Sequence, residues 1–257
     1  MLFIIERNMM ITGKQHYTYN PPDTPPKIIY VDEDILVADK PSGLLTVPGK
    51  HSDDSLTLRL REMYPGVNPV HRLDTSTSGI ILFSRNKSAN AVLSEQFRNR
   101  IPRKRYVAVC EGIIKENSGA LAYPMSRDWT QAALTSAPIH RVDYAEGRKA
   151  LTFFRVIHRD IARKITVVML EPHTGRTHQL RLHLQTFGYP ICNDRLYGNA
   201  DDECTARLEL HSCYLSFYHP KDGRKMALYA PADFLEGTGI DLRLYLPESG
   251  MEADQYC

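Results

Sequence analysis

The chain has 257 residues, of which 42% are hydrophobic and 24% are charged, and its formal net charge is +2. These values are typical of a soluble globular protein, and the length suits one large domain or two lobes around a cleft. The apolar start Met1–Ile5 is too short for a signal peptide and no later apolar run is long enough to cross a bilayer, so we expect a cytoplasmic protein without membrane contact.

An N-terminal extension, residues 1–26, is expected before the first strand, because four of the seven residues from 20 to 26 are prolines. The next elements in chain order are predicted from hydrophobic periodicity and from Gly, Pro and capping signals. They are strands at 28–31 and 35–38, a helix between Ser55 and Pro65, a strand at 80–83, a helix at 88–99, strands at 106–110, 151–157 and 165–170, a helix at 177–187, and strands at 210–218 and 225–229.

Many strands with a few helices, and no strict alternation of the two, predict the α+β class with a mixed sheet. Six acidic residues and one basic residue lie from position 232 onward. We therefore divide the chain into the extension at 1–26, a main domain at 27–234 and an acidic C-terminal tail at 235–257.

Asp74 is the most informative residue of the chain. It follows a His-Arg pair and precedes four hydroxyl residues and a glycine, directly before the apolar run 80–83. It is thus predicted to lie on a loop that enters a buried strand, a common way to present a reactive group. Taken alone, the segment also fits a tight turn in which the Asp side chain accepts hydrogen bonds from its own Thr and Ser neighbours.

The string His71-Arg72-Leu73-Asp74-x-x-Thr77-Ser78-Gly79 resembles the active-site motif of the RluA-type pseudouridine synthases. Three further segments, 40–49, 105–109 and 175–183, resemble other motifs of this family and occur in the family's order. The resemblance covers roughly residues 20–234, and the chain is identified as a member of the family. It implies an isomerase whose catalytic domain, residues 27–234, has a largely antiparallel mixed sheet in two subdomains around a cleft.

The resemblance also implies the active-site residues. Asp74 matches the catalytic aspartate, Tyr106 the active-site tyrosine and Arg181 the arginine that pairs with the aspartate. On the helix expected at 177–187, the periodicity places Arg181 and His178 together on a face away from the core, where they can border a cleft. Asp194 belongs to another segment that resembles the family and is expected to be structural.

RNA is the expected partner. Seven Lys or Arg and one acid lie between residues 75 and 110, and such a basic face suits the phosphates of RNA. A solvated helix end explains the run from Arg98 to Arg105 equally well on composition alone. The resemblance implies that Arg72 fills the space that the uridine leaves in the base stack when it flips out. The expected RNA-binding residues are Arg72, Arg103, Lys104, Arg105 and His178.

The chemistry that the resemblance implies breaks the N-glycosidic bond of uridine and rejoins the base through carbon, with Asp74 as nucleophile or as base. This reaction needs neither metal nor cofactor, and the sequence has no GxGxxG motif and no P-loop. The five cysteines form no CxxC pair, which favours reduced thiols. Two alternatives are an RNA-binding protein without activity and a glycoside hydrolase, which needs a second carboxylate that the matched motifs lack.

The substrate RNA is inferred from finer resemblances. Residues 20–22, 40–49 and 230–234 most resemble the RluA branch of the family. That branch implies dual specificity, for a hairpin loop of 23S rRNA and for tRNA anticodon stem-loops. The alternative is a relative that acts on tRNA only or on another rRNA site. We expect the protein to act as a monomer.

Overall fold

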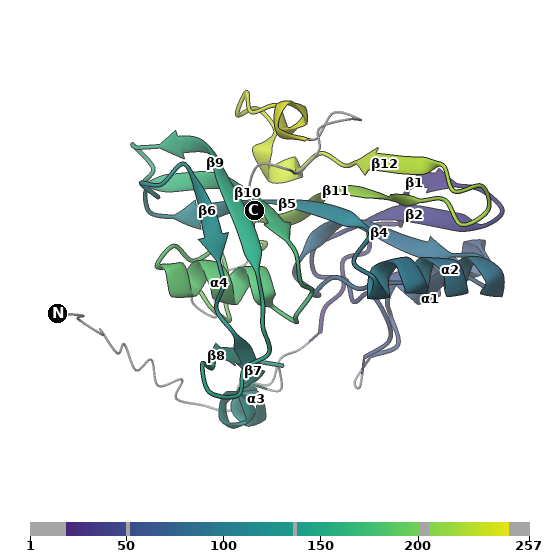
Figure 1. The fold of residues 1–257 in the computed structure, drawn as a ribbon, viewed down its shortest axis with the longest axis horizontal. Coiled ribbons are helices and arrows are strands. Elements are labelled where there is room, and N and C mark those ends of the chain that lie inside the picture. The colour runs from purple at the N-terminus through teal and green to yellow at the C-terminus, as the bar shows by residue number, and fades with distance from the viewer. Residues whose placement is uncertain (1–18, 50–51, 136–137, 201–205, 247–257) are drawn as a thin grey trace.

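The computed structural model describes residues 19–246 except for 50–51, 136–137 and 201–205 (Figure 1). The strands are β1 Lys27–Val31, β2 Ile35–Lys40, β3 Asn68–Pro69, β4 Ser78–Ser84, β5 Arg103–Glu111, β6 Ser118–Leu121, β7 Met125–Arg127, β8 His140–Val142, β9 Thr152–Asp160, β10 Ile165–Pro172, β11 Leu210–Tyr218 and β12 Lys225–Tyr229. The helices are α1 Leu56–Met63, α2 Lys87–Arg98, α3 Trp129–Thr135, α4 Gln179–Phe187 and the short 3-10 helices η1 Asp233–Leu235 and η2 Leu242–Tyr245.

Ten of the described strands form one sheet in the order β1-β2-β4-β11-β5-β10-β9-β6, with β3 beside β4 and β12 beside β11. The pairs are antiparallel except for β4 and β11, which run parallel. Figure 1 shows α1 and α2 below the half of the sheet that holds β2 and β4, and α4 below the half that holds β9 and β10. The predicted α+β class with a largely antiparallel mixed sheet is therefore confirmed.

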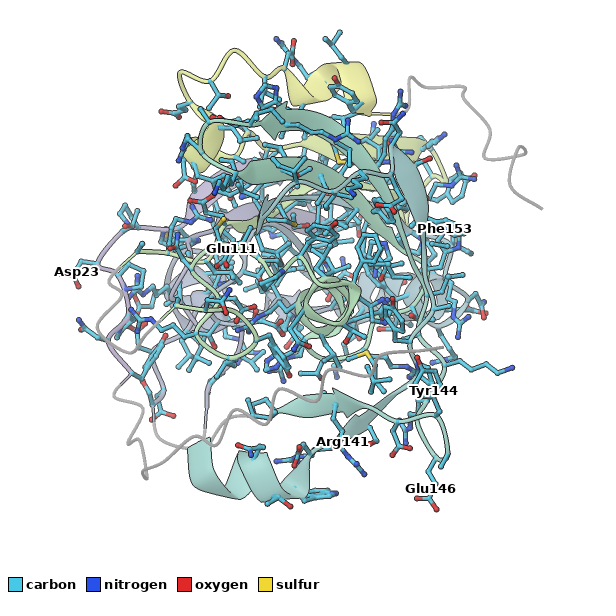
Figure 2. All side chains as sticks on the ribbon, turned by 90° about the vertical axis from the view of Figure 1, so that its left-hand side faces the viewer. Asp23, Glu111, Arg141, Tyr144, Glu146 and Phe153 are labelled. Carbon is cyan, nitrogen blue, oxygen red and sulfur yellow. The ribbon has the colours of Figure 1, made fainter. Side chains whose placement is uncertain are left out.

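A smaller lobe stands off from the main sheet, below it in Figure 1. It consists of the β7–β8 pair with α3 between them in sequence, a part of the chain for which we predicted no element. Figure 2 shows Glu146 at the tip of this lobe, where its side chain points away from the body of the protein.

The strand that follows Asp74 lies inside the sheet. All seven residues of β4 are buried, with β2 on one side and β11 on the other. Gly79 pairs with Ser212 at a backbone angle φ of +108°, and a Cβ atom added there would lie 2.3 Å from the carbonyl oxygen of Ser212. Glycine is thus required where the Asp74 loop enters β4, for both its conformation and its lack of a side chain.

Two segments that we predicted to lie outside the main domain contact the rest of the fold. Tyr19, near the start of the described chain, donates a hydrogen bond from its hydroxyl to Asp54 and accepts one from the backbone of Leu45. At the other end, Leu235 and Leu242 are buried against the face of the sheet opposite the helices, beside Val107 and Val109. No helix in the described part of the chain has the length and apolar character needed to cross a bilayer.

Candidate active site

A cleft of about 1280 Å³ opens between the two halves of the sheet. Its lining comes from the Asp74 loop, the end of α2 with the start of β5, and the segment from the end of β10 into α4. Of the residues that the sequence singled out, those that line the cleft are Arg72, Asp74, Arg103, Lys104, Tyr106, His178 and Arg181. The fold thus brings together positions that lie more than a hundred residues apart in the chain.

The loop that carries Asp74 is held from behind by the segment 40–49. Thr46 donates from its hydroxyl to the carbonyl of Leu73 at 2.9 Å, while Gly43 donates from its backbone to Thr75 at 2.8 Å. The Lys40 ammonium also donates to the Thr75 carbonyl, at 2.9 Å. These bonds lie on both sides of Asp74 and fix the backbone from which its side chain projects.

The Asp74 carboxylate accepts no hydrogen bond from any described residue, although the residue is only half-buried and lines the cleft. The backbone N–H of Thr77 donates instead to the backbone carbonyl of Asp74, at 3.1 Å. The alternative of a self-bonded Asp turn is therefore wrong. A carboxylate whose lone pairs are free in a cleft is available as a nucleophile or as a base.

Five ionisable groups surround Asp74 closely enough to respond to its charge. Burial has the largest effect on each of them: it lowers the pKa of the Lys, His and Arg groups and raises the pKa of the two tyrosines. The charge of the Asp74 carboxylate raises the pKa of all five groups. These groups are Lys40, Tyr106, His178, Arg181 and Tyr197. The net pKa is about 7 for Lys40 and about 4 for His178.

Arg181 does not form the expected pair with Asp74. Its Nε and Nη2 atoms donate to the two carboxylate oxygens of Asp194, at 2.8 and 2.6 Å. Burial lowers the pKa of Arg181, but the hydrogen bonds and charge of Asp194 raise it by more, so the guanidinium stays charged. The expected pairing is thus corrected, because the turn after α4 places Asp194 within reach of the same guanidinium.

Tyr106 lies on β5 with its side chain toward the cleft and is buried. Burial raises its pKa, and a hydrogen bond with Ser212 lowers it by less. The phenol therefore stays protonated at neutral pH, so that its hydroxyl can donate a hydrogen bond or a proton but does not act as a phenolate base. Its ring offers a face to a base that enters the cleft.

His178 precedes α4 in the left-handed conformation, with φ of +56°, so the helix begins at Gln179 and not at Thr177 as predicted. Its Nδ1 atom lies 3.0 Å from the Tyr197 hydroxyl, which also accepts a hydrogen bond from the backbone of His140 at 2.8 Å. Since burial lowers the pKa of His178 to about 4, its ring is neutral near pH 7.

Basic side chains line two sides of the cleft. Arg98, Arg100, Arg103 and Lys104 form one side. Lys149 and Arg176 lie among the lining of the other, and neither was predicted as a site residue. Arg176 falls within the segment 175–183 that carries the family resemblance, so that motif was a usable signal, whereas Lys149 has no local signal.

Arg105 is not part of this lining. Its guanidinium lies 3.1 Å from the Glu171 carboxylate and donates to the backbone carbonyl of Tyr245. Its bond to Tyr245 of η2 directs the guanidinium toward the C-terminal segment that packs beside Val107 and Val109, and not into the cleft. Arg105 therefore lies outside the cleft lining, and its contact with RNA stays a prediction. Arg103 to Arg105 belong to β5 and are not the helix end that composition alone allowed.

Carboxylates are scarce in the cleft. Among its described lining residues, only Asp74 and Glu171 are acidic, and Glu171 is paired with Arg105. A glycoside hydrolase needs a second carboxyl group that is free to act as acid or base. The lining therefore disfavours this alternative.

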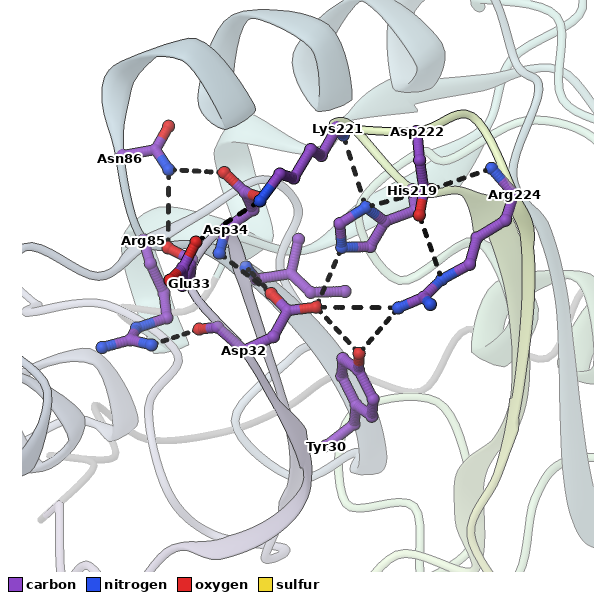
Figure 3. Close-up of polar contacts among 11 residues, drawn as sticks. Tyr30, Asp32, Glu33, Asp34, Arg85, Asn86, His219, Lys221, Asp222 and Arg224 are labelled. Atoms are coloured by element: carbon purple, nitrogen blue, oxygen red, sulfur yellow. Dashed lines mark hydrogen bonds and ion pairs between the residues drawn. The ribbon is translucent and has the colours of Figure 1, made fainter.

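One group of potential metal ligands lies outside the cleft, at the turns that join β1 to β2 and β11 to β12 (Figure 3). Ligand atoms of Asp32, Asp34 and His219 lie within 4.8 Å of one another. However, one oxygen of Asp32 accepts from the backbone of Asp34 and Ile35, and the other lies 2.9 Å from His219. These contacts tie the two turns together, and we assign the cluster a structural role.

Comparison with known proteins adds to this geometry. Residues 34–186 match a family model described as RNA pseudouridylate synthase. The dual-specificity RNA pseudouridine synthase RluA of Vibrio cholerae is 44% identical over 220 residues, which cover 84% of this chain and 87% of that protein. The protein of the same name from Escherichia coli (strain K12) is 41% identical over 220 residues, which cover 84% of this chain and 98% of that protein. Among solved structures, that of Human RNA Pseudouridylate Synthase Domain Containing 1 is similar to this chain, with a TM-score of 0.72 and 29% sequence identity. The alignment covers 84% of this chain and 88% of the human one.

Proposed function

The chain belongs to the RNA pseudouridylate synthase family, and we propose that Asp74 is the carboxylate with which it isomerises uridine in folded RNA. The observation that carries this assignment is the Asp74 side chain itself, which lines the cleft and accepts no hydrogen bond from a described residue. The backbone on both sides of it is fixed by the segment 40–49. Fixed geometry with free lone pairs is what attack on a ribose carbon requires.

The reaction is an isomerisation and conserves every atom of the nucleotide. The bond between N1 of the base and the anomeric carbon breaks, the base turns, and its C5 atom forms the new bond while its proton is released and N1 gains one. Asp74 acts either as the nucleophile at the anomeric carbon or as the base at the neighbouring carbon. Tyr106 supplies a ring face to the base, and Arg181 supplies positive charge beside Asp74.

The basic sides of the cleft support RNA as the substrate. Arg98, Arg100, Arg103 and Lys104 can contact the phosphates of a stem while a loop uridine enters the cleft. We propose that the substrates are a hairpin loop of 23S rRNA and tRNA anticodon stem-loops. The support is the resemblance of residues 20–22, 40–49 and 230–234 to the RluA branch, and the relatives whose names state dual specificity. A tRNA-only enzyme is the second candidate.

The proposal extends to how the protein acts. The three catalytic candidates come from the Asp74 loop, β5 and α4 of one chain. A monomer therefore suffices for the reaction, and we place it in the cytoplasm, where rRNA and tRNA lie. We also keep residues 27–234 as the catalytic domain, since the family match at 34–186 and the main sheet both fall within it.

Asp74→Asn tests the assignment. The substitution is expected to abolish formation of pseudouridine while RNA affinity stays within about threefold, because phosphate contacts supply the affinity. The assay is release of tritium from C5-labelled uridine in a compact anticodon-type hairpin, in which the target uridine lies in the loop. Turnover near that of the unmodified enzyme would remove Asp74 from the mechanism.

The same hairpin tests how the substrate is recognised. We expect it to be modified at a rate comparable to that of whole tRNA, because a loop uridine costs little to unstack. A hairpin from 23S rRNA should be modified in parallel if the specificity is dual. Modification of the tRNA hairpin alone would favour the second candidate, and modification of intact ribosomal RNA alone would place recognition outside the cleft.

A further inference from the structure

The Asp74 loop carries a buried hydroxyl group that has no partner in the described part of the structure. Thr77 is 2% exposed, and its Oγ1 atom makes no hydrogen bond with any described residue. Its neighbour Ser78 is also buried, but the Ser78 hydroxyl lies 2.8 Å from Nδ1 of His211. Burying a hydroxyl without a hydrogen bond destabilises a fold, and such groups are few in natural proteins. The Thr77 hydroxyl therefore calls for a role outside folding.

Its place in the cleft distinguishes Thr77 from other residues with an unbonded buried atom. Arg85 and His183 also bury a side-chain nitrogen without a partner, but other atoms of these two side chains are hydrogen-bonded, and neither residue lines the cleft. Thr77 has a single polar atom in its side chain, and it lines the cleft together with Asp74. A valine would have nearly the same shape without burying a polar atom. The hydroxyl is thus present at a cost in stability, on the wall of the candidate active site.

The backbone places this hydroxyl beside the sugar on which Asp74 is proposed to act. The N–H of Thr77 donates to the carbonyl of Asp74 at 3.1 Å, so the two residues are the first and the last of one tight turn. Ser78 follows as the first residue of β4 and pairs with His211 of β11, which fixes the end of the turn. In its two proposed roles Asp74 meets either the anomeric carbon of the ribose or the neighbouring C2′ atom. The 2′-hydroxyl is attached to C2′ and therefore lies next to both.

We propose that Thr77 binds the 2′-hydroxyl of the target ribose and so makes the enzyme specific for uridine over 2′-deoxyuridine. This inference rests on the proposed role of Asp74, because that role places the ribose at the turn. Two hydroxyls can pair in either direction, since each donates and accepts a hydrogen bond. The 2′-hydroxyl is also the group by which a protein distinguishes RNA from DNA at a given nucleotide. Threonine side chains pass between staggered rotamers, so the hydroxyl can turn from its buried position toward a ribose that enters the cleft.

Thr77→Val and a modified hairpin test the contact together. One hairpin carries uridine at the target position and the other carries 2′-deoxyuridine, with every other nucleotide unchanged. Single-turnover rates of tritium release are measured for both hairpins with both enzymes. The ratio of the uridine rate to the deoxyuridine rate should be about five to ten times larger for the unmodified enzyme than for Thr77→Val, as expected for one hydrogen bond between neutral groups. The 2′-hydroxyl also alters the reactivity of the glycosidic bond, but that effect is common to both enzymes and cancels between the two ratios.

Two further measurements support this comparison. Thr77→Ser keeps the hydroxyl and should restore the ratio of the unmodified enzyme. Where the deoxyuridine hairpin reacts too slowly to follow, the affinities of the two hairpins are measured in an Asp74→Asn background, and the same difference between Thr77 and valine is expected there.

The stability of Thr77→Val gives an independent test. The substitution removes a buried hydroxyl that has no partner, so the midpoint of urea unfolding should not fall. Thr166→Val is the matched control. Thr166 is fully buried on β10 outside the cleft lining, and its hydroxyl donates to the carbonyl of Gly112 at 2.8 Å and accepts from the N–H of Ile114 at 3.1 Å. This control should unfold at a lower urea concentration, with its ratio of rates unchanged.

Equal ratios for the unmodified enzyme and Thr77→Val would overturn the proposal even if the variant were slower, because the hydroxyl would then act on another group. A lower unfolding midpoint for Thr77→Val would also overturn it, since the hydroxyl would then be bonded within the fold. Asp74→Asn is assayed beside these variants. Turnover by Asp74→Asn would remove the proposed function, whereas an inactive Asp74→Asn together with equal ratios overturns only the role of Thr77.

Discussion

Gly79→Ala is expected to destabilise the protein more than any ordinary Gly→Ala change, because two separate costs meet at this position. The backbone has φ of +108°, which side chains with a Cβ atom rarely adopt. The added Cβ would also lie 2.3 Å from the carbonyl oxygen and 2.6 Å from the nitrogen of Ser212. Both atoms belong to the backbone of β11, which cannot move aside without separating from β4.

The two costs set the expected magnitude. A residue forced into a sparsely populated backbone region costs about 1–3 kcal/mol, and overpacking of a close contact costs about 1–3 kcal/mol more. We expect the free energy of unfolding to fall by about 4 kcal/mol, a large part of the about 5–15 kcal/mol that holds a typical domain together. For a domain of this size the unfolding midpoint should drop by about 10 °C.

Gly188→Ala separates the two costs. Gly188 has a similar φ of +94°, but nothing lies within 4 Å of the position of an added Cβ. It should therefore lose only the conformational cost, about 1–2 kcal/mol. Urea unfolding of both variants, followed by circular dichroism, measures the difference. Equal losses in the two variants would refute the steric argument, and a Gly79→Ala protein as stable as the unmodified one would refute the whole reasoning.

Three further outcomes are expected. Tyr106→Phe should retain turnover within about tenfold, because it keeps the ring face that the base contacts, and a loss of about 100-fold or more with folding intact would assign the hydroxyl a role in proton transfer. Replacing Arg98, Arg103 and Lys104 together with Gln should weaken hairpin binding and reduce the slope of log K against log salt by about two to three, whereas Arg105→Gln, whose side chain faces away from the cleft, should leave the slope unchanged. The free energy of unfolding should fall as the pH drops from about 6.5 to 4. Burial lowers the pKa of three histidines in the folded protein, so over this range protons bind to these histidines in the unfolded chain only. Urea titrations at both pH values measure the change, and equal free energies of unfolding would contradict the prediction. These histidines, with pKa values of about 3, 4 and 4, are His71, His178 and His211.

Much of the fold could be predicted from hydrophobic pattern because the central strands are buried on both faces. The apolar run 80–83 lies within β4, and the run 165–170 lies within β10. Polar boundaries were less predictable. β5 begins at Arg103, three residues before the predicted start, because Arg103 pairs with Ser216 of β11 across the sheet. Such pairing joins backbones distant in sequence, and the polar side chains at the strand's start carry no trace of it.

The residues of the candidate site could also be predicted from the sequence, but their pairing could not. Each motif is local, so Asp74, Tyr106 and Arg181 were found without knowledge of the fold. The carboxylate that pairs with Arg181 was not found, because helical periodicity shows only that the arginine has an accessible face. Asp74 and Asp194 both lie near the guanidinium, and the tight turn after α4 brings Asp194 into hydrogen-bonding distance of it. Lys149 was missed for a similar reason, since only the fold brings it to the cleft.

The contacts around Asp74 explain how two cations can lie near a carboxylate and yet leave its oxygen atoms free. Lys40 is fully buried, and its three N–H groups go to the carbonyls of Pro41, Leu44 and Thr75. A neutral amine has only two N–H groups to offer, so this network favours the ammonium although burial lowers the pKa of Lys40 to about 7. Arg181 is likewise engaged, by Asp194. Two cations therefore lie near Asp74, and because their N–H groups donate to other acceptors, the carboxylate oxygen atoms stay free for either proposed role, nucleophile or base.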